Sequence, residues 1–351
     1  MTATITDSIA QRRVSASEFV RERAAALDLG ETDTRIDVSK LGELGLFGLG
    51  CQGGPVAEMV AVIEDVAAES LSAGFSAWAH RMALEYVVRG PAAVQAKYQA
   101  KLESGAAVGV TAMAAGLKYV AGLGEVALVA TEVDGGGLQI SGPIHWASNV
   151  FDDALIVLCA RSADSTKTYV AIIEASAPGI TVRPASQLLA LNSTASTSLV
   201  LDAVHIPAEN IIGTDLTEFV KGVRPTFLLL QTAFCSGISR TSVEESAKCL
   251  GGLGEGFVDE HAELAVELAA LRDRLGRFAA DTTSASAREL IQLRLDGSRL
   301  AMAATRLEVT LKGGAGYSMK SPTNRRFREA AFLPVQSPSE GQLRWELARS
   351  S

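Results

Sequence analysis

Cysteine, runs of basic residues and long apolar runs are all scarce in this chain of 351 residues. Its four cysteines, Cys51, Cys159, Cys235 and Cys249, are far apart and form no CxxC pair, which indicates buried thiols and neither a zinc site nor a disulfide framework. No stretch reaches the roughly 18 apolar residues of a membrane helix, and the N-terminus has no signal-like pattern. We therefore expect a cytoplasmic protein with no membrane partner.

Basic residues are outnumbered by acidic ones, 32 to 40, which gives a net charge of −8. Apart from Arg325-Arg326 there is no basic run that could follow a phosphate backbone, so nucleic acid is not an expected partner. The chain is 48% apolar and 21% charged. It is long enough to bury one large core or two to three packed subdomains.

The hydrophobic period changes twice along the chain. Apolar residues recur at helical spacing from residue 15 to about 106, then β-rich runs separated by turn residues continue to about Gly213. After Arg224-Pro225 the helical period returns, in runs at about 225–249, 258–281 and 284–312 and two shorter runs after Pro322 and Ser339. We predict an α+β fold with an N-terminal helical domain (1–106), a middle β-barrel or sandwich domain (107–214) and a C-terminal four-helix bundle (215–351).

Specific strings accompany this order. The most informative lie near the C-terminus, where G-G-A-G-Y at 313–317 is followed by Pro322, Arg325 and Arg328-Glu329. Earlier strings are L-G-E-L-G-L-F-G-L at 41–49, V-T-A-M-A-A-G at 110–116 and S-G-P-I-H-W-A-S-N at 141–149. Together they resemble the acyl-CoA dehydrogenase superfamily over nearly the whole chain.

This resemblance implies an FAD-dependent oxidoreductase that acts on an acyl-CoA or a similar small molecule, as a homodimer or homotetramer. It implies that Thr111 hydrogen-bonds the flavin, that Trp146 covers one face of the ring and that Ser148 lies near flavin N5. The tail glycines Gly313 and Gly314 are expected to contribute to cofactor binding. Two hydroxyls and an aromatic plate would provide fixed polar groups in an otherwise apolar slot.

The sequence departs from the family where a base is needed. Dehydrogenation of an acyl thioester requires a carboxylate near the α-carbon, and the family's usual Glu corresponds to Gln336, which cannot accept a proton near neutral pH. The base position that some members use on the first long helix of the bundle corresponds to Phe227 or Val223. If Gln336 merely fills the old base position, Gln336→Glu is expected to keep the fold and can add slow acyl-CoA oxidation.

Flavin binding is also weakened in sequence. The family's phosphate-contacting Ser and its neighbouring Asp correspond to Leu117 and Lys118, and its R-x-x-F-G signature corresponds to G-G-L-G-E-G-F at 251–257. The FAD is therefore expected to be weakly bound or absent, with Lys118 and Lys312 compensating in part.

Two histidines are candidates for other roles. His145 precedes Trp146 and is a possible acid or base, although a solvent-facing strand histidine is the more common case. For His80, on a helix that lines the substrate pocket of related flavin oxygenases, a helix-surface position is the default expectation.

Three functional hypotheses follow. The first is a dehydrogenase with an unrecognised base, such as His145. The second is a flavin monooxygenase or oxidase, in which reduced flavin activates O₂ and no α-proton base is needed. The third is a non-catalytic subunit that shares a flavin site with a full-motif homologue.

Overall fold

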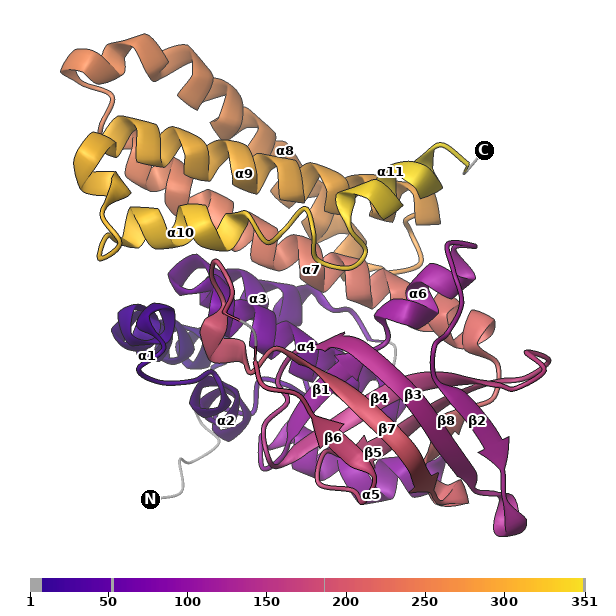
Figure 1. Ribbon diagram of the computed structural model, residues 1–351. Helices are drawn as coiled ribbons and strands as arrows, with labels where there is room; N and C mark the ends of the chain where they lie inside the picture. Colours follow the sequence, from indigo (N-terminus) through magenta and orange to yellow (C-terminus); the bar gives the residue numbers. More distant parts are fainter. Residues whose placement is uncertain (1–7, 52–53, 186, 350–351) are drawn as a thin grey trace.

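The computed structural model describes residues 8–51, 54–185 and 187–349. In its N-terminal part, α4 is the central element, because every one of its residues is buried. It packs between the other N-terminal helices, β1 and the long C-terminal helix α7 (Figure 1). The bounds are α1 (Ile9–Leu29), α2 (Arg35–Glu43), α3 (Ala57–Glu69), α4 (Leu71–Val88) and α5 (Ala92–Glu103).

The middle of the chain forms, within the described residues, one eight-stranded sheet. Seven strands follow the order β6-β7-β3-β2-β4-β5-β8, and the eighth, β1, pairs in parallel with β4. Strand β4 is its core, since seven successive residues from Ala154 to Ala160 are buried. The bounds are β1 (Val108–Ala112), β2 (Val129–Glu132), β3 (Leu138–Ala147), β4 (Ala154–Ser162), β5 (Thr168–Glu174), β6 (Ile180–Val182), β7 (Thr197–Ile206) and β8 (Ile211–Gly213), with the short helix α6 (Ala114–Val120) after β1.

The C-terminal helices pack lengthwise on one another above the sheet (Figure 1). Their bounds are α7 (Leu216–Ala247), α8 (Val258–Ala280), α9 (Ala287–Tyr317), α10 (Pro322–Ala330) and α11 (Glu340–Leu347). Helix α7 crosses α3 so closely that a Cβ on Gly237 would lie 2.2 Å from the carbonyl oxygen of Glu64. Among the described residues, no helix has the length and apolarity needed to cross a membrane.

The α+β prediction is confirmed, and one detail of it is corrected. Helix α7 begins at Leu216 and not after Pro225, because Asp215 caps it by accepting a hydrogen bond from the Glu218 amide at 3.0 Å, and Pro225 lies inside the helix. Strand β3 contains His145, which was expected to be a strand residue, and it continues through Gly142 and Pro143.

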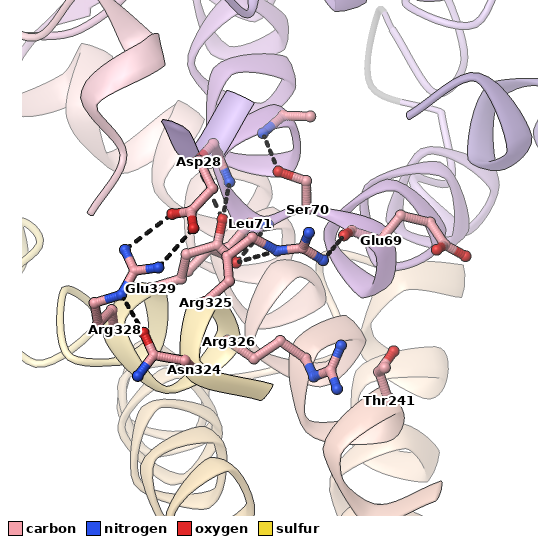
Figure 2. Close-up of polar contacts among 12 residues, drawn as sticks. Asp28, Glu69, Ser70, Leu71, Thr241, Asn324, Arg325, Arg326, Arg328 and Glu329 are labelled. Atoms are coloured by element: carbon pink, nitrogen blue, oxygen red, sulfur yellow. Dashed lines mark hydrogen bonds and ion pairs between the residues drawn. The ribbon is translucent and has the colours of Figure 1, made fainter. Parts of the chain in front are cut away.

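The tail after Gly316 is docked on the N-terminal helices by charged side chains of α10 (Figure 2). Arg328 faces Asp28 of α1, with Nη2 donating to the carboxylate at 2.6 Å, and Arg325 donates to the backbone carbonyl of Glu69 at 2.7 Å. Glu329 is fully buried and accepts from the first backbone amides of α4, those of Leu71 and Ser72. A carboxylate at a helix N-terminus is favoured by the helix dipole, so α10 fixes the chain that follows it against α4.

Candidate functional site

A cavity of about 620 Å³ lies where the sheet, α4, α7 and the connection from α10 to α11 meet. One wall is aromatic. The Phe75 and Trp78 rings of α4 stack at 5.4 Å between centroids, Phe227 of α7 meets Trp78 edge-on at 5.0 Å, and Phe332 meets Phe75 edge-on at 5.0 Å. Phe227, one of the two positions expected for an alternative base, is therefore part of an apolar wall.

No Asp or Glu of the described chain lines this cavity, and its charged lining residues are Lys118 and Arg328. Arg328 is held by the ion pair with Asp28, whereas Lys118 is exposed at the cavity edge. Glu218 and Asp215 lie at the start of α7, where Asp215 serves as the helix cap. The cavity is thus lined without a carboxylate that could take a proton from a ligand.

Gln336 lines the cavity and is only 5% exposed. Its Oε1 accepts a hydrogen bond from Nη2 of Arg294, on α9, at 2.9 Å. Arg294 Nε donates in turn to Oε1 of Gln231, on α7, at 3.0 Å, and Nη2 also donates to the Leu333 carbonyl at 3.1 Å. The residue after Gln336 is held by the same hydrogen-bond network, since Gln231 Nε2 donates to the carbonyl of Ser337 at 2.9 Å.

Arg294 decides which way both glutamines point. A guanidinium has only donors, so each glutamine must turn its oxygen toward Arg294 and its NH₂ group away from it. Arg294 is fully buried and has no carboxylate partner in the described part of the chain. Burial lowers the pKa of its guanidinium, because desolvation disfavours the charged form. The position expected for a base therefore carries the NH₂ donor of Gln336, and the cation Arg294 is hydrogen-bonded to the oxygen of the same amide.

Sequence reasoning missed Arg294, although a signal was present. It stands three or four residues from Leu290, Ile291, Gly297 and Ser298, which are all buried on one face of α9. An arginine on the apolar face of an amphipathic helix must find buried partners, but the sequence does not show which ones.

On the sheet side, Ser148 lines the cavity and begins a chain of hydroxyl groups. Its Oγ lies 2.7 Å from Ser196 Oγ, which lies 2.7 Å from Thr194 Oγ1, which donates to the carbonyl of Leu191 at 2.8 Å. Because a carbonyl can only accept, the one hydroxyl proton of Thr194 is donated to Leu191. Ser196 must therefore donate its proton to Thr194, and Ser148 must donate its proton to Ser196. Ser148 therefore offers only lone pairs to the cavity.

Thr111 and Trp146 also line the cavity. Thr111 Oγ1 lies 3.0 Å from the hydroxyl of the buried Tyr86, whose pKa is raised by burial, so the phenol stays protonated and can donate to Thr111. Trp146 is 59% exposed. A register shift between Ile144 and Ala147 in the pairing of β3 with β7 turns two successive side chains outward there.

The two candidate histidines, His80 and His145, lie outside the cavity lining. His145 is the other exposed residue at this bulge. His80 is buried, so the default expectation of a helix-surface histidine was wrong. Its Nδ1 accepts from the Gly109 amide at 2.9 Å and its Nε2 lies 2.8 Å from the Leu102 carbonyl, to which it must donate. Burial lowers the His80 pKa to about 3, so the ring is neutral and structural.

The glycines expected to contact the cofactor are not gathered at the cavity. Gly313 and Gly314 are exposed near the end of α9, where Gly313 has φ +58°. Gly116 is a packing position, because a Cβ there would lie 3.0 Å from Cys159 Sγ. Lys312 pairs with Glu245, at 3.3 Å. Of the residues predicted to bind the cofactor, Thr111, Trp146, Ser148 and Lys118 line the cavity together with Gln336, whereas Gly313, Gly314 and Lys312 do not.

No protein-family model matches the sequence. Solved structures match over nearly the whole chain. Butyryl-CoA dehydrogenase from Megasphaera elsdenii has a TM-score of 0.87 at 17% identity, covering 99% of both chains. A glutaryl-coenzyme A dehydrogenase in its glutaryl-CoA complex has a TM-score of 0.86 at 21% identity, covering 99% of this chain and 96% of that one. The FAD complex of PigA has a TM-score of 0.83 at 17% identity, covering 99% and 98%. The chain therefore has the acyl-CoA dehydrogenase fold, as its sequence motifs predicted.

Proposed function

We propose that the chain is an FAD-dependent oxidoreductase whose substrate, an acyl thioester or a related small metabolite, lies in the cavity between the aromatic wall and Gln336. The observation that carries the proposal is the placement of Thr111, Trp146 and Ser148 together on the sheet side of one 620 Å³ cavity. Among proteins of this fold, PigA has been crystallised with FAD and a glutaryl-CoA dehydrogenase with FADH₂.

The residues on the sheet side fit a flavin ring. Thr111 can donate once Tyr86 donates to it, Ser148 can accept, and the exposed indole of Trp146 supplies an apolar plate. For the phosphates, the cavity edge offers the cation of Lys118. Bound FAD would supply the electron acceptor for an oxidation or, once reduced, the reductant for O₂. The aromatic wall would exclude water from the substrate.

Within this proposal, a reaction that needs no carboxylate base fits the site best. The cavity has no Asp or Glu in its described lining, and Gln336 presents a donor where α,β-dehydrogenation of a thioester needs an acceptor of a proton. These observations favour the flavin monooxygenase or oxidase form of the chemistry over ordinary acyl-CoA dehydrogenation.

The visible absorption spectrum of the purified chain tests the proposal. We expect flavin bands, either as purified or after FAD is added and free FAD is removed, and we expect the combined Thr111→Val and Ser148→Ala changes to lower the retained flavin. A chain that retains no FAD alone, and retains it only when mixed with a full-motif homologue, would replace the proposal with the shared-site subunit. No retained FAD in either case would refute both.

For the chemistry, the flavin-loaded chain is reduced with dithionite without oxygen and then mixed with air-saturated buffer. Rapid reoxidation by O₂ is expected for a monooxygenase or oxidase. Slow reoxidation, together with flavin reduction by a short acyl-CoA, would instead establish a dehydrogenase. Gel filtration on the same sample tests the proposed homodimer or homotetramer.

A further inference from the structure

Gln336 and the buried guanidinium of Arg294, which donates to it, determine which kind of ligand group can bind at this end of the cavity. Because Arg294 holds the Gln336 oxygen at 2.9 Å, the free end of this side chain is its NH₂ group. Donation from Arg294 also polarises the amide, which makes those N–H groups stronger donors. A ligand at Gln336 must therefore present an acceptor.

Charge points to an anionic acceptor. Arg294 is fully buried without a carboxylate partner in the described residues, and the charged side chains of the cavity lining are the cations Lys118 and Arg328. A buried charge without a partner is unfavourable, and an anion nearby offsets that cost. Arg328 is already neutralised by Asp28, so Arg294 is the cation that a ligand at Gln336 would compensate.

A neutral carbonyl gains less in this position. It could accept from the Gln336 amide, but it carries no net charge for the field of Arg294 to act on. Hydrogen bonds to an ionised acceptor are about twice as strong as those between neutral groups. The aromatic wall beside Gln336 limits screening by water, since Phe75 and Trp78 are 5% and 3% exposed.

We propose that Gln336 binds an anionic oxygen of the substrate, so that the cavity selects a small molecule bearing a carboxylate next to an apolar portion. This inference rests on the proposed function in taking the cavity to be the substrate site. Gln336 is then a specificity-determining residue that donates, in place of a base that accepts. Gln231, which contacts Arg294 and does not line the cavity, is a positioning residue.

Calorimetric titration of the FAD-saturated chain with hexanoate and with hexanamide tests this, since the two probes share an alkyl chain and differ in charge. We expect hexanoate to bind more tightly by about tenfold, the equivalent of about 1.4 kcal/mol. In Gln336→Glu, which still accepts from Arg294 but neutralises it and removes the donor, hexanoate binding should weaken at least about tenfold while hexanamide changes less.

The control matched to Gln336→Glu is Gln231→Glu. It neutralises Arg294 from a residue that does not line the cavity and leaves the Gln336 amide in place. It should reduce the preference for hexanoate without abolishing binding of hexanamide, and far-ultraviolet circular dichroism checks that both variants fold. Equal affinity for the two probes, no detectable hexanoate binding, or an unchanged affinity in Gln336→Glu would overturn the inference. Because flavin loading is read separately from the visible spectrum, titration without FAD distinguishes this failure from failure of the proposed function.

Discussion

Replacing Gln336 by glutamate is the most informative single change, because its effect on stability follows directly from Arg294. The introduced carboxylate would take the place of an amide oxygen that lies 2.9 Å from Nη2 of a fully buried guanidinium. Removing one partner of a buried ion pair costs about 3 to 5 kcal/mol, and here the change runs in reverse, from a lone cation to a pair. Desolvation of the new carboxylate subtracts from that gain. We expect a net stabilisation of about 1 to 3 kcal/mol at pH 7.

The same contact determines whether the variant becomes a base. A neighbouring cation favours the charged carboxylate and lowers its pKa, whereas burial raises it, and we expect the contact with Arg294 at 2.9 Å to dominate. A carboxylate held by Arg294 is therefore a poor acceptor for an α-proton. Gln336→Glu should therefore stabilise the chain and leave acyl-CoA oxidation undetectable, whereas the sequence by itself allowed a slow gain of that activity.

Urea unfolding followed by circular dichroism measures the effect, with Gln139→Glu on the exposed side of β3 as the control. The sign with pH also follows. If the expected lowering of the folded pKa holds, the extra stability is present above the unfolded pKa of the carboxylate and is lost as the pH falls through its folded pKa. An unfolding midpoint that is unchanged or lower than that of the wild type at pH 7, or rapid flavin reduction by an acyl-CoA, would refute the reasoning about Arg294.

Three further predictions concern other contacts. Because burial lowers the His80 pKa to about 3, the unfolded chain binds a proton at this residue below about pH 6.5 and the folded chain does not, so urea stability should fall by up to about 1.4 kcal/mol per pH unit between pH 6 and 4. His80→Gln should flatten that dependence relative to wild type, and an equal slope would contradict the assignment. Asp28→Asn leaves Arg328, whose side chain is 10% exposed, without its carboxylate. It should lower the free energy of unfolding in urea by about 2 to 3 kcal/mol and speed proteolysis after α10. An unchanged cleavage rate would show that α10 docks without this pair. Ser148→Ala removes the acceptor on the sheet side and should weaken FAD binding about tenfold by equilibrium dialysis, and equal affinity would place the flavin elsewhere.

Much of the architecture was predictable because it depends on local pattern. The change from helical to alternating period and back indicated the order of helices, sheet and bundle, and the motifs at 41–49 and 313–317 indicated the fold. One boundary was wrong. Helix α7 begins at Leu216, where Asp215 caps it, and it contains Pro225, whereas the helical period was expected to return only after Pro225.

Of the candidate site, the sequence identified Thr111, Trp146, Ser148 and Gln336, and the structure places them around one cavity. It also identified Gly313 and Gly314, which lie outside that cavity. Their distance from the cavity along α9 is not visible in a motif, because spacing in sequence does not fix which end of a long helix faces a site.

The sequence by itself predicted the acyl-CoA dehydrogenase fold, and its resemblance to that superfamily assigned Gln336 to the position of the usual base. It could not decide what that glutamine does, because an amide can accept with its oxygen or donate with its nitrogen. Only the packing of α9 against α7 and the turn before α11 brings Arg294 to Gln336, and a guanidinium that can only donate fixes the direction of every hydrogen bond around it.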